Sequence, residues 1–153
     1  DFDVIHEELL IGQDSWEKAE KALVEEAGEL AIKKAGLSKE DINFYIGGDL
    51  MNQIISNSFA ARTLGIPYIG IFGACSTSME SLALAALMVN SNAANYVLAS
   101  ACSHNAGAEK QFRYPTEYGS QKPPTAQFTV TGAGSAVVAK GGKGPKITSA
   151  TIG

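Results

Sequence analysis

Three short apolar runs alternate with helix-like segments along the first two thirds of the chain, and this alternation constrains the fold more than any other feature. The runs cover residues 42–47, 68–72 and 96–101, and each has the length of a buried strand. Strand, helix and strand at this spacing imply parallel strands joined by right-handed crossovers. We therefore predict an α/β fold with a mostly parallel mixed sheet flanked by helices.

The first helix shows signals at both ends. Asp14 followed by Glu17 is typical of a capping box, and Gly36 fits the left-handed residue that closes a helix. Between them, apolar residues recur every three or four positions, so we expect one face to be buried. That face consists of Trp16, Ala19, Leu23, Ala27 and Leu30.

Two further helices follow from similar signals. One is predicted over residues 56–64, because Gly65 closes it and a proline lies just beyond. The other is expected to begin at a capping box made of Thr77 and Glu80. Both helices lie between predicted strands, as parallel pairing requires.

The last third of the chain changes character. Residues 103–125 show no clear period, and a loop of this length inside a compact domain is usually functional or forms an interface. Two strands are predicted after it, over residues 128–139 and 146–152, joined by a glycine-rich turn.

Composition excludes several classes of protein. Hydrophobic residues make up 45% and charged residues 18% of the 153 positions, which suits one folded domain and not a disordered chain. The net charge of −4, with scattered Lys and Arg, argues against a nucleic-acid groove. We find no stretch long enough for a membrane span and no signal peptide, and therefore expect neither.

Cysteine and histidine usage gives no sign of a disulfide framework or a metal site. Cys75 and Cys102 are too few for a framework, and His6 and His104 have no metal-ligand spacing. We expect a reducing compartment, no metal and no cofactor.

The sharpest chemical feature is the turn 73–77, which follows a predicted strand and precedes a predicted helix. This places Cys75 near the positive end of a helix, where backbone N–H groups favour a thiolate. The same geometry presents a nucleophile above the carboxyl edge of a sheet. The alternative is a small buried cysteine that only packs, and the two remain equally open.

Other polar residues are expected near this edge. His104 follows the third predicted strand, and it could act as a base towards Cys75 if the two strands were neighbours. Arg113, Tyr114 and Lys122 lie in the long loop, where a guanidinium can bind a carboxylate through two hydrogen bonds. These residues suit a small anion, although a solvated surface role is the simpler alternative for each.

Several stretches resemble the stage V sporulation protein AD family, within the thiolase-like superfamily. The similarity runs from about Ser15 to Gly153, and the segment around Arg113 distinguishes this family from ordinary condensing enzymes. The stretches that carry it are residues 47–53, 72–81, 103–105, 111–119 and 121–123.

The resemblance implies a function in spore formation. Members are thought to bind dipicolinic acid and to support its uptake, as a calcium chelate, into the developing spore. It implies peripheral attachment to the spore inner membrane beside integral-membrane proteins of the same operon, and self-association. The ligand would contact Cys75, Ser76, His104, Arg113, Tyr114 and Lys122.

The resemblance also implies that residues 1–153 are the amino-terminal half of a thiolase-like fold, and we expect a fragment that lacks the second half. In thiolase-like enzymes that half supplies the partners of the cysteine, so we predict no enzymatic activity. Two alternatives stay open. One is an acyl-transfer enzyme with Cys75 as nucleophile, and the other is a dimerising assembly module.

Overall fold

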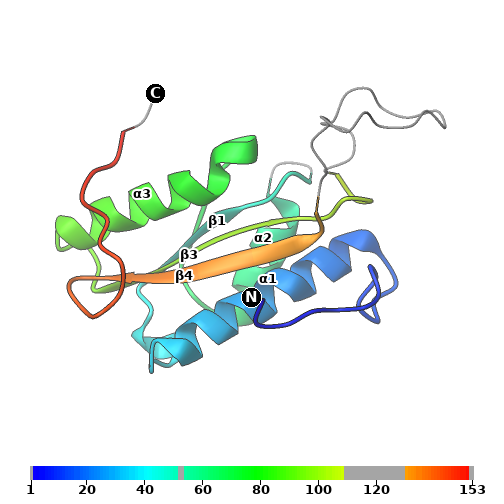
Figure 1. Cartoon of the computed structure of the whole chain (residues 1–153), viewed down its shortest axis with the longest axis horizontal. Helices are drawn as coiled ribbons and strands as arrows, with labels where there is room; N and C mark the ends of the chain where they lie inside the picture. The colour runs from blue at the N-terminus through cyan, green and yellow to red at the C-terminus, as the bar shows by residue number, and fades with distance from the viewer. Residues whose placement is uncertain (1, 52–53, 109–129, 152–153) are drawn as a thin grey trace.

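The computed structural model describes residues 2–51, 54–108 and 130–151. Its centre is a sheet of four strands in the order β2-β1-β3-β4 (Figure 1). β1 pairs in parallel with β2 and β3, whereas β4 is antiparallel to β3, so the predicted mostly parallel mixed sheet is confirmed. The strands are β1 (Phe44–Gly48), β2 (Tyr68–Gly70), β3 (Tyr96–Ser103) and β4 (Gly132–Ala139).

Helices cover both faces of this sheet (Figure 1). α1 (Trp16–Lys34) and α2 (Ile55–Leu64) pack together on one face, and α3 (Thr77–Asn90) lies on the other. Tyr45 of β1 points into the core beneath α1 and α2, and the next residue, Ile46, points into the core beneath α3. Successive strand residues therefore serve opposite cores, as the pleat of a strand requires.

The ends of α1 follow the predicted signals with one shift. The N-cap is Ser15 and not Asp14, because the Ser15 hydroxyl accepts the hydrogen bond of the Lys18 N–H at 3.3 Å. Asp14 instead forms an exposed ion pair with the Lys18 ammonium at 2.7 Å. The predicted end is confirmed, since Gly36 has a φ of 71° and its N–H donates to the Lys33 carbonyl.

The buried face of α1 differs from the predicted one. Of the expected stripe only Ala19 is fully buried, and the other fully buried residues, Glu20, Val24, Gly28 and Ile32, lie about one residue round the helix from it. A Cβ on Gly28 would come within 3.3 Å of Leu98 in β3, so the small residue lets the helix approach the sheet. The packing of α1 therefore depends on a glycine and buries a carboxyl group.

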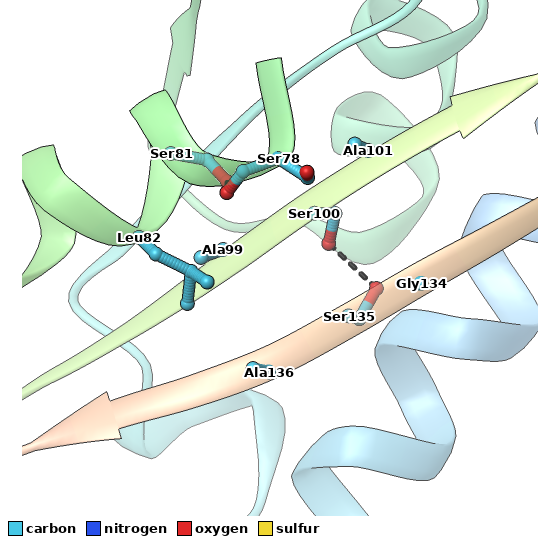
Figure 2. A pocket seen from close by; sticks show the side chains of 9 residues that line it. All are labelled: Ser78, Ser81, Leu82, Ala99, Ser100, Ala101, Gly134, Ser135 and Ala136. Carbon is cyan, nitrogen blue, oxygen red and sulfur yellow. Dashed lines mark hydrogen bonds between the residues drawn. The ribbon is translucent and has the colours of Figure 1, made fainter. Parts of the chain in front are cut away.

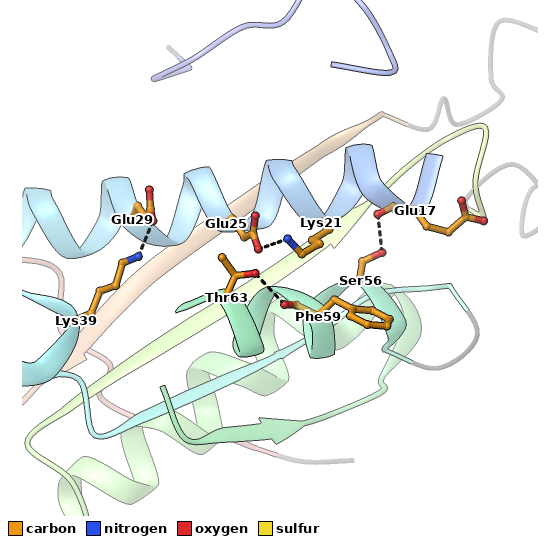
Figure 3. Close-up of polar contacts among 8 residues, drawn as sticks. All are labelled: Glu17, Lys21, Glu25, Glu29, Lys39, Ser56, Phe59 and Thr63. Carbon is orange, nitrogen blue, oxygen red and sulfur yellow. Dashed lines mark hydrogen bonds and ion pairs between the residues drawn. The ribbon is translucent and has the colours of Figure 1, made fainter. Parts of the chain in front are cut away.

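Polar contacts link residues of α1, of α2 and of the segment that follows α1 (Figure 3). Lys21 pairs with Glu25, and Lys39 pairs with Glu29, each at 2.6 Å. The Ser56 hydroxyl donates to the Glu17 carbonyl at 3.5 Å and so joins α2 to the first turn of α1. Surface ion pairs of this kind contribute little to stability, typically 0–1 kcal/mol.

The remaining elements agree with the sequence except at the end of the chain. α2 closes at Gly65, whose φ is 73°, as predicted. Residues 146–151 are not a strand, and they are exposed. A β-like pattern becomes a strand only when a neighbouring strand supplies its hydrogen bonds, and none of the described strands pairs with this segment. Within the described ranges, no helix has the length and apolar character needed to cross a membrane.

Candidate ligand-binding site at the carboxyl edge of the sheet

The carboxyl ends of β1, β2 and β3 meet at one edge of the sheet, which is where open α/β sheets bind ligands. Leu50, Met51 and Ala108 form a small buried cluster there, from the segments that follow β1 and β3. Ala74, from the turn after β2, packs against this cluster. The tertiary structure therefore brings all three segments together beside Cys75.

Cys75 lies in a 3-10 turn, Ala74–Ser76, directly before α3. The residue is exposed, so the alternative of a buried packing cysteine is wrong. Ala74 has a φ of 48°, a left-handed conformation that costs a non-glycine residue free energy. The sharp turn at Ala74 leads the chain from the sheet into α3 and leaves the thiol open to solvent.

Thr77 holds this turn closed. Its hydroxyl donates to the Ala74 carbonyl at 2.8 Å and accepts from the Gly73 N–H at 3.2 Å. The Ser76 hydroxyl donates to the Gly73 carbonyl at 2.7 Å. The predicted capping box of Thr77 and Glu80 is therefore wrong, because Thr77 is the first residue of α3 and its hydroxyl serves the preceding turn.

Glu80 brings a negative charge to the same turn. A Cβ on Gly73 would come within 2.3 Å of Glu80 Oε2, so the carboxylate lies over Gly73. Glu80 belongs to the first turn of α3, where the helix N-terminus stabilises a carboxylate. An anionic ligand at this terminus would be repelled by Glu80 unless a cation lay between them.

His104 is part of the architecture of this edge. The side chain is fully buried, its Nε2 lies 2.9 Å from the Leu9 carbonyl, and its Nδ1 lies 3.2 Å from the Gly107 N–H. These partners fit the neutral tautomer in which Nε2 donates and Nδ1 accepts. His104 could act on Cys75 only if the strands that precede them, β3 and β2, were neighbours. That condition is not met, because β1 lies between β2 and β3.

Trp16 forms an aromatic wall next to His104. The two rings lie 5.1 Å apart at 37°, and Trp16 keeps 36% of its surface exposed. Gly107 makes this arrangement possible, since a Cβ there would lie 2.6 Å from Met51 Cε and 3.5 Å from Trp16. The sequence indicated Trp16 only as a core residue of a helix, because its ring partner is 88 positions away.

A buried carboxylate that was not predicted from the sequence organises the floor of the site. Asp49 follows β1 and is 1% exposed. Its Oδ1 accepts from the Met51 N–H at 3.0 Å, and its Oδ2 accepts from Asn57 N at 2.8 Å and from Asn57 Nδ2 at 3.1 Å. Tyr45 donates its hydroxyl to the Asn57 Oδ1. The signal that could have found Asp49 is a lone acidic residue directly after a buried strand.

A second buried carboxyl group lies close to Asp49. Glu20 is fully buried, and its Oε1 accepts from the Cys102 thiol at 3.3 Å. Burial, reinforced by the negative charge of Asp49, raises the pKa of Glu20 to about 7. Burial also raises the pKa of the Cys102 thiol, with Glu20 and Asp49 adding to the effect. Cys102 is therefore an unreactive core thiol, in contrast to Cys75.

A cleft lined with hydroxyl groups begins one helical turn beyond Cys75 (Figure 2). Ser78 and Ser81 line it from α3, and β3 and β4 line its opposite side. There the Ser100 and Ser135 hydroxyls form a hydrogen bond at 2.6 Å across the two strands.

Three of the predicted ligand-binding residues, Arg113, Tyr114 and Lys122, lie outside the described residues, as does most of the 103–125 loop. Their roles stay predictions, as do those of Cys75, Ser76 and His104. In the part of the chain that the structure describes, no group of three or more His, Cys, Asp or Glu side chains is arranged to hold a metal ion.

The fold is that of the thiolase-like condensing enzymes. The 3-oxoacyl-[acyl-carrier-protein] synthase III from Aquifex aeolicus VF5 superposes with a TM-score of 0.64 at 22% identity, over 81% of this chain and 39% of that one. A tetronic acid condensing enzyme superposes with a TM-score of 0.59 at 22% identity, over 80% and 37%. The predicted thiolase-like fold is confirmed.

The sequence places the chain more narrowly. The family model described as stage V sporulation protein AD matches residues 1–153. The stage V sporulation protein AD of Bacillus subtilis (strain 168) is 49% identical over 152 residues, which are 99% of this chain and 45% of that protein. The chain belongs to the stage V sporulation protein AD family and spans less than half the length of this relative.

Proposed function

We propose that the protein binds dipicolinic acid and supports its uptake into the developing spore. Membership of a sporulation family carries this proposal, and the exposed turn at the N-terminus of α3 supports a ligand site at this edge. Dipicolinate has two carboxylates on an aromatic ring, so its site needs hydrogen-bond donors, a cation and an apolar surface. We assign the hydrogen-bond donors to backbone N–H groups of the turn. Arg113 and Lys122 supply the positive charge, and Trp16 and Tyr114 supply the apolar surface.

The charge of Glu80 supports the calcium chelate as the bound form. A free dianion beside the carboxylate over Gly73 would be repelled, whereas a bound calcium ion neutralises the ligand. Arg113 is assigned to binding a carboxylate of the ligand. In this proposal Ser76 and Cys75 contact the ligand from the turn, and the buried His104 stabilises the segments that form this edge of the sheet.

Attachment and assembly form the second part of the proposal. We assign the protein to the surface of the spore inner membrane, held there by integral-membrane proteins of the same operon. Self-association is included because β2 is an edge strand whose Ile69 is 38% exposed, and Phe72 just beyond it is 46% exposed. Edge strands with apolar side chains readily pair with another chain.

The binding proposal predicts a specific effect of Arg113. Arg113→Ala in the full-length protein is expected to weaken dipicolinate binding by roughly 10- to 100-fold, the value of a charge-assisted hydrogen-bond pair. Cys75→Ala is expected to weaken it less. Isothermal titration calorimetry with calcium dipicolinate measures both, and Arg62→Ala, which removes an exposed arginine of α2, is the matched control. Unchanged affinity in the Arg113 and Cys75 variants would remove both residues from the site.

Acyl transfer is the second candidate function, favoured by the exposure of Cys75 in the turn before α3. It predicts that iodoacetamide modifies Cys75 faster than buried Cys102 by a factor on the order of 100 or more. It also predicts a covalent acyl adduct on Cys75 after incubation with an acetyl thioester. Mass spectrometry distinguishes the two cysteines, with Cys75→Ser as control. A reactive Cys75 that never acquires the acyl group would contradict this function.

A further inference from the structure

A chain of buried polar contacts links α1 to the floor of the candidate site. It starts at Glu20, whose Oε1 lies 3.3 Å from Cys102 Sγ in β3. The same sulfur lies 3.1 Å from Nδ2 of Asn57 in α2. Asn57 donates to Asp49, which in turn accepts from the Met51 N–H. The contacts are continuous, so a change of charge at Glu20 acts on groups that position Met51.

The surroundings of Glu20 favour a neutral carboxyl group. Its Oε2 is buried and has no hydrogen-bond partner among the described residues. The charged groups that act on its pKa are carboxylates, Asp49 after β1 and Glu17 on α1 itself, and both raise it. The groups that face it from β3 and α2 are the Cys102 thiol and the Ser56 hydroxyl, which carry no positive charge. An isolated buried negative charge is costly, and a second one beside Asp49 adds repulsion.

We propose that Glu20 is a proton switch for this edge of the sheet. When protonated, it packs as a neutral group between α1 and the sheet, and the chain of contacts to Met51 is complete. When it ionises, the buried charge loosens α1 from β3 and, through Cys102 and Asn57, loosens the Asp49–Met51 segment. The switch acts on the same edge as the proposed ligand site but does not depend on the identity of the ligand.

The direction of the pH effect follows from linkage. The pKa of Glu20 is raised from 4.5 to about 7 in the folded protein, so the folded state holds its proton more tightly than the unfolded state. The folding free energy contributed by this proton is fully present below pH 4.5. It is lost as the pH rises from 4.5 to about 7, and it does not change further above pH 7. The corresponding change in the unfolding equilibrium constant is on the order of 100-fold.

The test compares the full-length protein with Glu20→Gln, which keeps the shape of the side chain and removes its proton equilibrium. Urea unfolding between pH 4.5 and 8.5 is expected to show the loss of stability in the wild type and not in Glu20→Gln. Glu29→Gln, on the same helix but exposed and absent from the groups that act on Glu20, is the matched control and is expected to show the same pH dependence as the wild type. Hydrogen exchange adds a local readout, since the Met51 and Asn57 amides should lose protection at pH 8 in the wild type relative to Glu20→Gln.

Two results would overturn the proposal. One is the same pH dependence of stability and of Met51 protection in the wild type and Glu20→Gln. The other is a pKa near 4.5 for Glu20 in the wild type, measured through the carbon-13 NMR signal of its carboxyl carbon. This measurement needs no variant and so does not depend on whether Glu20→Gln folds. If the Met51 and Asn57 amides lose protection from exchange at pH 8 while the affinity for calcium dipicolinate does not change, the switch is still supported. Failure of the switch proposal can therefore be told apart from failure of the ligand proposal.

Discussion

Gly48→Ala is expected to leave the full-length protein unable to fold stably. Gly48 ends β1, and a Cβ at this position would lie 2.0 Å from the Ile71 carbonyl oxygen and 3.0 Å from Thr77 Cγ2. The first of these is a backbone atom of the segment after β2, so no rotation of a side chain can relieve the contact. Separating β1 from that segment would also break the hydrogen bond from Ile71 N to the Gly47 carbonyl.

Overpacking a well-packed interior typically costs 1–3 kcal/mol, and a clash with backbone lies at or above the upper end, so we expect a loss of about 3 kcal/mol or more. Thermal unfolding and the yield of folded protein measure it. Gly134→Ala is the matched control, because Gly134 also lies in a strand but a Cβ there meets no atom within 4 Å. Equal stability of the two variants would show that β1 and the Cys75 turn are not packed as closely as described.

Asp49→Ala is the second change with a large expected effect. It removes the acceptor of three N–H groups, one from Met51 and two from Asn57, in a position that water does not reach. Buried donors left without acceptors cost about 1–3 kcal/mol each, and the loss of a charged acceptor is at the upper end. We expect a total loss of about 3–5 kcal/mol after partial relaxation.

Urea unfolding measures this loss, with Asp14→Ala as control because Asp14 forms only an exposed ion pair. Asp49→Asn should fall between the wild type and Asp49→Ala, since one amide oxygen can still accept while the amide nitrogen faces donors. The same series should weaken ligand binding in the same order, because Met51 forms the floor beneath Ala74. An Asp49→Ala variant as stable as the control would mean that Asp49 does not organise this edge.

These two residues show how the edge of the sheet works as a unit. Gly48 lets the turn after β2 approach β1, and Asp49 then ties the next loop to α2. The turn that carries the exposed Cys75 thiol is therefore packed against the segments that follow β1 and β3. A ligand bound there would meet a rigid turn, closed by Thr77, and not a loose loop.

Much of the fold could be predicted from local signals. The ends of α1 and α2 at Gly36 and Gly65 were correct, because a left-handed residue closes a helix whatever surrounds it. The parallel pairing of the first three strands followed from the spacing of the helices between them. The position of Cys75 between a strand and α3 was also correct, since both elements are recognisable from their own residues.

The errors fell where a local signal had two possible outcomes. Thr77 could cap α3 or close the preceding turn, and the close approach of Gly73 selected the turn. Residues 146–151 had a strand-like pattern but no neighbouring strand in the described structure. His104 emerged at the expected edge, yet its partners are the Leu9 carbonyl and the Gly107 N–H, which no spacing in the sequence indicates.

The amino-acid sequence alone therefore determined the succession of helices and strands, the turn that carries Cys75, and the family. These depend on contacts between residues a few positions apart, and such contacts leave a pattern in the sequence. Only the tertiary structure decided that Glu20 and Asp49 are buried together, and that His104 is buried against Leu9 and Gly107, after a strand that does not neighbour the strand before Cys75. Burial and charge depend on which distant segments exclude water from a group, and that is settled only when the chain is folded.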